Sequence, residues 1–211
     1  MIHMKIAVIH GSAHSLLADQ GLLLERMVEL GHEVHTLAPP ADEEVLTGLK
    51  ELGTESATYP LTRGKFSPLA DLTSMSQIKQ ILYRIKPDVV LSISSKPMTF
   101  GSMAARMAWV DHQKRIYSLV TGLGFPFTEK AGWKRRIIYA YTKYMMGGGL
   151  GACTGIIFRN SEDEAFFRAF GVIRDTARTT IIENLIPEKD TPADQSRDAS
   201  INDLLSYMEL I

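Results

Sequence analysis

The chain has 211 residues, a formal net charge of -1 at pH 7 and a hydrophobic content of 45%. This composition is that of an ordinary globular protein that can bury one core, and the balanced charge excludes an overall field that attracts nucleic acid. The single cysteine, Cys153, excludes an internal disulfide and fits a reducing compartment. No run reaches the ~18 apolar residues of a membrane span, so we expect a soluble or peripheral, cytoplasmic protein.

Short apolar runs alternate with amphipathic segments along the first half of the chain. Strands are predicted at residues 5–12, 33–40 and, more weakly, 55–61, where the runs end in turn residues. Helices are predicted between them at residues 19–32, 42–53 and 67–87. Their ends carry the expected signals, because Gly31 and Gly53 follow the first two, and Ser67 can cap the third.

The second half continues the same alternation. Strands are predicted at residues 88–94, 115–122, 154–158 and 179–184, and helices at 99–110, after Gly132 and at 161–171. The strands are continuous apolar runs, as parallel strands covered on both faces are. The predicted fold class is therefore α/β: a doubly wound, Rossmann-like parallel sheet with helices on both faces.

The end of the chain differs in composition from the rest. We predict a Rossmann-like domain over residues 1–186, a polar, proline-bearing linker over 187–199 and a short amphipathic tail helix over 200–211. The tail helix has apolar residues at helical spacing. It must therefore dock either on this domain or on another chain.

Ligands of such folds bind beyond the carboxyl ends of the strands, so the residues that follow each strand are the candidate binding residues. Gly122 and Gly124 follow a strand and would let a backbone approach a ligand closely, although a tight turn is an equally good interpretation. Lys96 can offer a positive charge to a phosphate, although a solvated loop lysine is the commoner role. His14 is a candidate polar contact at the mouth of the site.

Several cofactor sites are disfavoured. The position that a dinucleotide fingerprint reserves for its third small residue is Phe127, and no P-loop motif is present, so NAD binding is not expected. His10 and His14 are four residues apart without a visible third ligand, so zinc is not expected. The glycine run at residues 147–152 follows a helix, and we predict a flexible helix end and turn there.

The segment after Gly132 combines aromatic, apolar and basic residues. Trp133, Ile137, Ile138, Tyr141, Tyr144 and Met145 fall mainly along one side of the predicted helix, whereas Lys134, Arg135, Arg136 and Lys143 lie elsewhere. This arrangement is typical of a helix that lies on an anionic membrane surface. A helix packed on the sheet with a basic outer face is the alternative interpretation.

Segments in order along residues 5–184 resemble the N-terminal domain of the family 4 glycosyltransferases of the GT-B type. They are LGHEVHTLAPP, KPDVVLSISSKPMTFGSMAARMAWV, VTGLGFPFTE and IIFRNSEDEAFFRAFG. The third resembles the glycine loop of members that extend lipid-diphosphate-linked sugars in capsule and O-antigen assembly. Thr121 stands where many members carry a histidine, and other members of the lipid-linked subgroup have Thr or Ser there.

The resemblance implies a transferase that moves a sugar, with retention, from a nucleotide-sugar donor to an acceptor, without a metal or other cofactor. The N-terminal domain would hold the acceptor, often an undecaprenyl-diphosphate glycan, and a second Rossmann-like domain would hold the nucleotide. No catalytic residue is assigned. The implied acceptor-binding residues are Gly11, Ser12, His14, Lys96, Pro97, Thr121, Gly122, Gly124, Glu129 and Asn160, with Lys96 toward the diphosphate. The implied membrane contacts are Trp133, Lys134, Arg135, Arg136 and Tyr141.

The sequence holds no counterpart of the donor-binding half. We therefore expect, as a partner, either another domain or subunit that supplies the donor-binding half or a second copy of this chain in a homodimer. We expect little transferase activity from this chain alone. The expected partners are a lipid-linked glycan acceptor and an anionic membrane surface on the inner face of the cell membrane, and no nucleic acid. Two alternatives remain: a membrane-peripheral scaffold that recruits a partner through its tail helix, and a stand-alone nucleotide-binding Rossmann protein.

Overall fold

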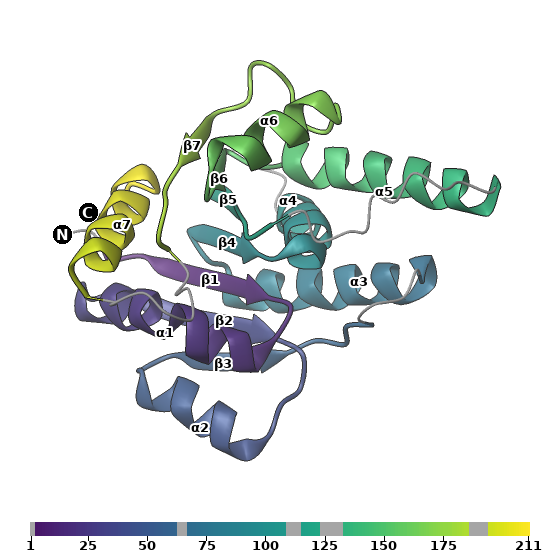
Figure 1. Ribbon diagram of the computed structural model, residues 1–211. Helices are drawn as coiled ribbons and strands as arrows, with labels where there is room; N and C mark the ends of the chain where they lie inside the picture. Colours follow the sequence, from purple (N-terminus) through teal and green to yellow (C-terminus); the bar gives the residue numbers. More distant parts are fainter. Residues whose placement is uncertain (1–2, 63–66, 109–114, 123–132, 186–193) are drawn as a thin grey trace.

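A computed structural model of the chain describes residues 3–62, 67–108, 115–122, 133–185 and 194–211 (Figure 1). In these residues the strands are β1 (Lys5–His10), β2 (Glu33–Ala38), β3 (Glu55–Thr58), β4 (Val89–Ile93), β5 (Arg115–Val120), β6 (Gly155–Phe158) and β7 (Thr179–Ile181). The helices are α1 (Ala13–Glu29), α2 (Glu43–Glu51), α3 (Pro68–Ile85), the π-helical turn η1 (Pro97–Gly101), α4 (Ser102–Ala108), α5 (Trp133–Gly151), α6 (Ser161–Ala169) and α7 (Asp194–Tyr207).

The strands form one parallel sheet in the order β3-β2-β1-β4-β5-β6-β7. The order reverses between β1 and β4, which are neighbours in space although two strands separate them along the chain. Such a reversal is the topological switch point of a doubly wound sheet, where the loops that leave the two strands diverge and leave room for a ligand. The predicted α/β fold class is confirmed.

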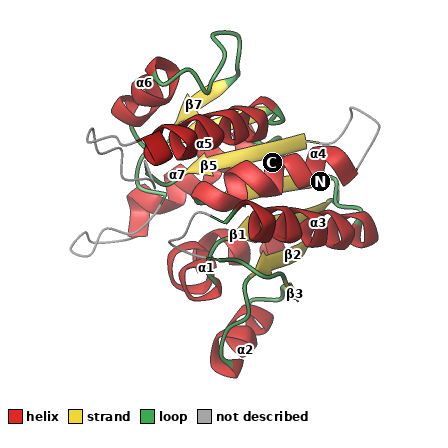
Figure 2. Cartoon of the chain, turned by 90° about the vertical axis from the view of Figure 1, so that its right-hand side faces the viewer, coloured by secondary structure: helices red, strands yellow, loops and turns green. Residues whose placement is uncertain are grey.

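Alternate residues of each strand feed two separate cores. On β1, Ile6 and Val8 pack with α1 and α7 on one face of the sheet, whereas Ala7 and Ile9 pack with α3 and α4 on the other. All four are fully buried. This burial on both faces explains why the strands are continuous apolar runs in the sequence rather than alternating ones. Figure 2 shows α3, α4 and α5 stacked side by side over one face of the sheet.

The tail helix begins earlier than predicted. Helix α7 starts at Asp194, inside the segment predicted as a polar linker, because the polar residues there form the first turns of a helix whose later turns are apolar. Arg197 donates a hydrogen bond to the carbonyl of Asp19 on α1. Leu204 and Leu205 are fully buried in the core cluster that α1 also lines, so the helix docks on its own domain.

The glycine run at residues 147–151 lies inside α5 rather than in a turn that follows it, which corrects the prediction. A Cβ atom at Gly149 would lie 2.5 Å from the carbonyl oxygen of Thr99 and 2.6 Å from its Cα. Only glycine therefore lets α5 approach the backbone of η1 this closely. The predicted helix over residues 99–110 is likewise divided, because the π-helical turn η1 precedes α4. Such turns are rare and are frequently found at functional sites.

Candidate functional site

The loops that follow β1 and β4 meet at the switch point. The backbone N–H of Gly11 donates to the hydroxyl of Ser94 at 3.2 Å, and a Cβ atom at Gly11 would come within 2.9 Å of the same oxygen. Ser94 has a φ of 77°, in the left-handed region that non-glycine residues rarely adopt. Backbone strain of this kind clusters at functional sites and persists only where the surroundings hold it. The two loops therefore form one fixed unit at the carboxyl edge of the sheet.

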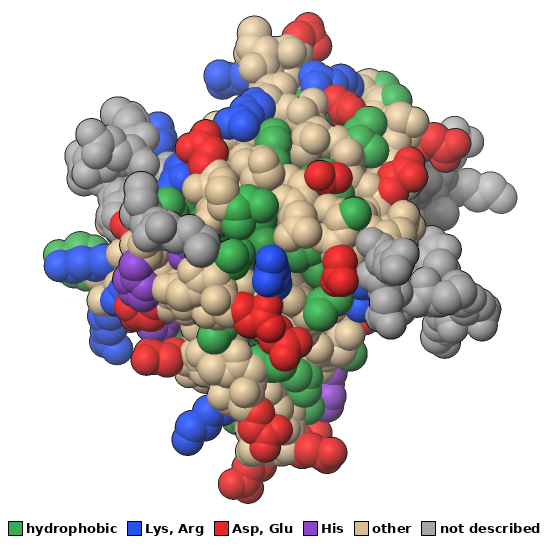
Figure 3. All heavy atoms as spheres, turned by 90° about the vertical axis from the view of Figure 1, so that its left-hand side faces the viewer, with side chains coloured by type: hydrophobic (Ala, Val, Ile, Leu, Met, Phe, Trp, Pro, Cys, Tyr) green, Lys and Arg blue, Asp and Glu red, His purple; other side chains and the backbone are tan. Residues whose placement is uncertain are grey.

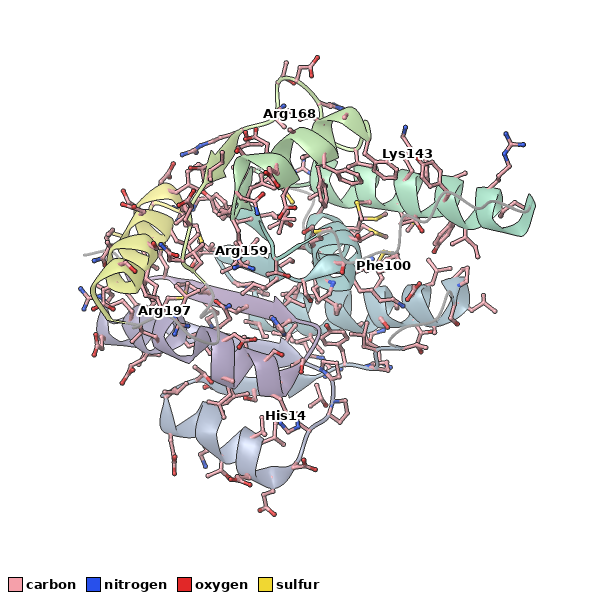
Figure 4. The ribbon with its side chains drawn as sticks, viewed as in Figure 1. His14, Phe100, Lys143, Arg159, Arg168 and Arg197 are labelled. Carbon is pink, nitrogen blue, oxygen red and sulfur yellow. The ribbon has the colours of Figure 1, made fainter. Side chains whose placement is uncertain are left out.

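Two predicted residues at the start of α1 have different surroundings. Ser12 is the N-cap of α1, and its hydroxyl accepts a hydrogen bond from the backbone N–H of Ser15 at 3.3 Å. His14 is exposed, and its Nε2 atom lies 3.7 Å from a carboxylate oxygen of Asp42. In Figure 4 His14 lies beside α2, away from the middle of the carboxyl edge, whereas Arg159, which follows β6, lies near the centre of the view.

Lys96 is held by a buried carboxylate, so it is not the solvated loop lysine that its sequence context favours. Its Nζ atom lies 2.6 Å from Oδ1 of Asp71 and donates to the carbonyl of Thr62 at 2.7 Å. Asp71 lies on α3 and is only 3% exposed, whereas 26% of the Lys96 side chain is exposed. The pair joins α3 to the loop after β4 and leaves part of the lysine accessible at the carboxyl edge.

Burial raises the pKa of the Tyr141 phenol on α5, and the negative charge of Asp71 raises it further. Asp71 of α3, Lys96 after β4 and the carbonyl of Thr62 form one connected set of polar contacts. We call this group the Asp71 cluster.

The remaining predicted site residues are dispersed. Pro97 is buried at the start of η1. Thr121 and Gly122 follow β5 and are partly exposed; Gly122 has a φ of 140° and open space where a Cβ atom would lie. Asn160 is exposed and caps α6, where its Oδ1 atom accepts from the backbone N–H of Asp163 at 2.7 Å. Gly124 and Glu129 lie outside the described residues.

The family of the chain follows from sequence comparison. A model of the glycosyl transferase 4-like family matches residues 19–158, more than half of the chain. The chain belongs to the glycosyl transferase 4-like family. The match runs from the middle of α1 to the end of β6, and so includes β4, Asp71, Lys96 and the loop after β5, whereas β1 and Gly11 precede it.

Individual relatives share less sequence. A curated relative from Campylobacter jejuni, N,N'-diacetylbacillosaminyl-diphospho-undecaprenol alpha-1,3-N-acetylgalactosaminyltransferase, is 22% identical over 169 residues, which are 80% of this chain and 43% of the relative. Two solved structures share the fold. A putative UDP-N-acetylglucosamine 2-epimerase from Listeria monocytogenes is 16% identical with a TM-score of 0.56, over 92% of this chain and 50% of that one. MurG from Acinetobacter baumannii is 12% identical with a TM-score of 0.54, over 91% and 47%. The chain spans less than half the length of its curated relative.

The outer surface of α5 carries exposed apolar and basic side chains in this glycosyltransferase-like domain. Ile137 is 56% exposed and Tyr144 is 79% exposed, and Arg136 is also exposed. Lys143 lies over the ring of Phe170 at 5.4 Å from its centroid. The side chains of Trp133, Lys134 and Arg135 lie outside the described part of the structure. Among the predicted membrane contacts, Tyr141 is only partly exposed.

Asp71 is the site residue that sequence reasoning missed. Its signal was present, because Asp71, Ser74, Ile78 and Leu82 follow each other at helical spacing and all four are buried. A carboxylate in line with the apolar stripe of a helix requires a cationic or hydrogen-bonding partner. The partner is 25 residues away in sequence, and only the fold identifies it as Lys96.

In the described part of the chain, no group of three His, Cys, Asp or Glu side chains is arranged to hold a metal ion, and no helix has the length and hydropathy to cross a membrane. A groove of about 370 Å³ lies between α1 and α7, lined by Leu22, Glu25, Arg26, Glu29, Asp198, Ile201 and Asn202. Figure 3 shows acidic side chains gathered around a basic one in the middle of the face on this side. The groove shares no residue with the predicted site.

Proposed function

We propose that this chain is the acceptor-binding half of a retaining glycosyltransferase that transfers a sugar from a nucleotide-sugar donor to a lipid-diphosphate-linked glycan in capsule or O-antigen synthesis. Membership of the glycosyl transferase 4-like family supports the reaction class. The name of the Campylobacter jejuni relative includes a diphospho-undecaprenol acceptor, which supports the acceptor class. The observation that carries the proposal is a partly exposed lysine, Lys96, that a buried carboxylate fixes beside the switch point.

Lys96 suits a diphosphate because an ammonium group is a compact point charge with three N–H donors. Asp71 and the carbonyl of Thr62 fix the position of this ammonium group before any ligand arrives. A fixed cation loses less conformational entropy when it binds a phosphate than a free surface lysine does. We place the acceptor diphosphate at Lys96 and its sugar toward the loops that carry Gly11 and Gly122.

The donor-binding half belongs, in this proposal, to another domain or subunit. The nucleotide-sugar is a substrate, and no metal takes part in the transfer. The acceptor is lipid-linked, so the domain works on the inner face of the cell membrane, with the basic and apolar surface of α5 against the lipid. The exposed positions of Arg136, Ile137 and Tyr144 support that orientation.

Calorimetry with a short-chain, water-soluble lipid diphosphate linked to an N-acetylhexosamine tests the proposal without a membrane. We expect this chain to bind that compound, to bind the matching lipid monophosphate at least about tenfold more weakly because one phosphate charge is lost, and not to bind a UDP-sugar. Lys96→Ala should abolish the preference for the diphosphate. Lys50→Ala, on the exposed side of α2, is the matched control and should bind as the native chain does. Saturable binding of UDP-sugar with none of the lipid diphosphate would contradict the proposal.

A further inference from the structure

The net charge is only -1, but the charges are distributed unevenly over the helices on the two faces of the sheet. We call α3, α4 and α5 the basic layer. Helix α6, which packs with α5 on the same side of the sheet, is not part of it, because it carries three acidic residues and one basic residue. Helices α3, α4 and α5 together carry seven Lys and Arg residues, two on α3, one on α4 and four on α5, and a single acidic residue, Asp71. That one carboxylate is buried against Lys96. On the opposite face of the sheet, α1, α2 and α7 each carry three acidic residues and one basic residue.

Exposed apolar side chains gather on the basic layer. Nine large hydrophobic side chains of the described residues are exposed, and seven of them belong to α3, α4 and α5. The seven are Leu69, Leu72, Tyr83, Met107, Ile137, Tyr139 and Tyr144. Single exposed apolar residues need no explanation, but a concentration on adjacent helices marks a surface that meets something less polar than water.

The start of α3 contributes the most exposed of these residues. Leu69 is 81% exposed and Leu72 is 46% exposed. They lie on either side of Ala70 and the buried Asp71 and share the outer side of the helix with Thr73 and Ser76, which are polar but uncharged. Neither a family motif nor an aromatic pattern in the sequence predicts a contact surface at the start of α3.

We infer that the whole α3–α4–α5 face, and not α5 alone, is the surface that docks on anionic phospholipid, with Leu69 and Leu72 as a second apolar contact. The chemistry of these three helices is that of an interfacial surface: apolar and tyrosine side chains, cations around them and, on α3, α4 and α5, no exposed carboxylate to be repelled. The acidic layer of α1, α2 and α7 then faces away from the membrane. A symmetric dimer through this face is disfavoured, because it would bring two basic layers together.

This orientation places the Asp71 cluster at the lipid surface. Asp71 is on α3, one of the helices whose outer sides would contact the bilayer, and it lies between Leu69 and Leu72 along that helix. Resting on the proposed function, the inference gives a route for the acceptor: a diphosphate at the membrane surface would reach Lys96 while its lipid chain stays in the bilayer.

Vesicle co-sedimentation tests the inference with the whole chain. Native protein is compared with the double variant Leu69→Glu, Leu72→Glu on phosphatidylcholine vesicles with and without phosphatidylglycerol. We expect binding that depends on phosphatidylglycerol, and a loss of roughly tenfold or more in the double variant, because two apolar contacts become two like charges. Ile211→Glu makes the same chemical change at an exposed position outside the three helices. This control should bind as the native chain does.

A second double variant tests whether a loss of binding comes from a folding defect. Leu69→Ser with Leu72→Ser keeps the net charge, and it should also lose binding while its circular dichroism spectrum stays native. The inference would be overturned if native protein did not bind anionic vesicles, or if the leucine variants bound them as well as native protein does. It would also be overturned if native protein formed a dimer without lipid and the leucine variants were monomeric, because the face would then be a protein interface. The calorimetry with the soluble acceptor uses no bilayer, so its result tests the proposed function independently of membrane docking.

Discussion

Gly149 provides a sharp test of how α5 is placed on the site. It lies inside α5, and the backbone of η1 occupies the space that any larger side chain at this position would need: a Cβ atom would lie 2.5 Å from the Thr99 carbonyl oxygen and 2.8 Å from that of Met98. Both obstructing groups are backbone atoms. A Gly149→Ala variant can therefore fit only if α5 moves away from η1.

The neighbouring Gly148 is the matched control. A Cβ atom there would lie 3.6 Å from the sulfur of Met103, which is an ordinary contact. Ala is preferred over Gly inside a helix by about 0.5–1 kcal/mol, so Gly148→Ala should stabilise the protein by that amount. Gly149→Ala gains the same propensity term but forces an overpacked contact that costs about 2–3 kcal/mol, the upper part of the usual range, because the obstructing atoms belong to the backbone. We expect a net loss of about 1–2 kcal/mol, and so a difference of about 2–3 kcal/mol between the two variants.

Urea unfolding of the two variants, followed by circular dichroism, measures this difference directly. In a thermal experiment it corresponds to roughly 4–12 °C in Tm, at about 2–4 °C per kcal/mol for a chain of this size. Gly149→Ala should also weaken acceptor binding, because η1 follows Lys96 directly. If Gly149→Ala is as stable as Gly148→Ala, the close approach of α5 to η1 is wrong.

Three further predictions address the buried pair, the acid side of the stability profile and the chemistry. Asp71→Ala should lower the free energy of unfolding by about 1–3 kcal/mol, less than the loss expected for a fully buried ion pair, because Lys96 still reaches water. Asp71→Asn should lower it less, and the urea midpoints of the two variants measure both effects. Hydrogen bonding from Thr179, and then Arg168, lowers the pKa of Glu164 below its ordinary 4.5. Its contribution to stability is therefore complete above that pH and lost as the pH falls below it, so Glu164→Gln should flatten the acid side of a plot of unfolding midpoint against pH, and an unchanged profile would refute this. Purified chain alone, supplied with nucleotide-sugars and a lipid-diphosphate acceptor, should give no measurable transfer of radiolabelled sugar, whereas sustained turnover would show that the chain is a complete transferase.

Strands were the most predictable part of the fold. Burial on both faces requires apolar or small residues from Ile6 to Ile9 of β1 and throughout β4, and that requirement is visible in a single sequence as an uninterrupted run. Helix ends were less predictable. Helix α1 begins at Ala13, six residues before the predicted start at residue 19, because its first turn depends on the Ser12 cap and not on the apolar spacing that begins further along.

Features that depend on distant residues were missed. Gly149 reads as a flexible helix end until η1 is seen packed against it. Asp71 and Lys96 are 25 residues apart, so the sequence shows an isolated acid and an isolated loop lysine rather than a pair. The parallel pairing of β1 and β4 places the residues that follow the two strands, Gly11 and Ser94, at one edge of the sheet, and this much follows from the predicted topology alone.

The acceptor site is tested most directly by mapping the bound ligand on the chain. Amide chemical shifts of isotope-labelled protein would be followed by NMR during titration with the short-chain lipid diphosphate linked to a sugar. We expect the largest changes at the carboxyl edge of the sheet, at Gly11, Lys96 and Gly122, and none for Lys96→Ala at the same concentration. Changes confined to the groove between α1 and α7, or changes that only a UDP-sugar produces, would contradict the proposal that this domain binds the acceptor.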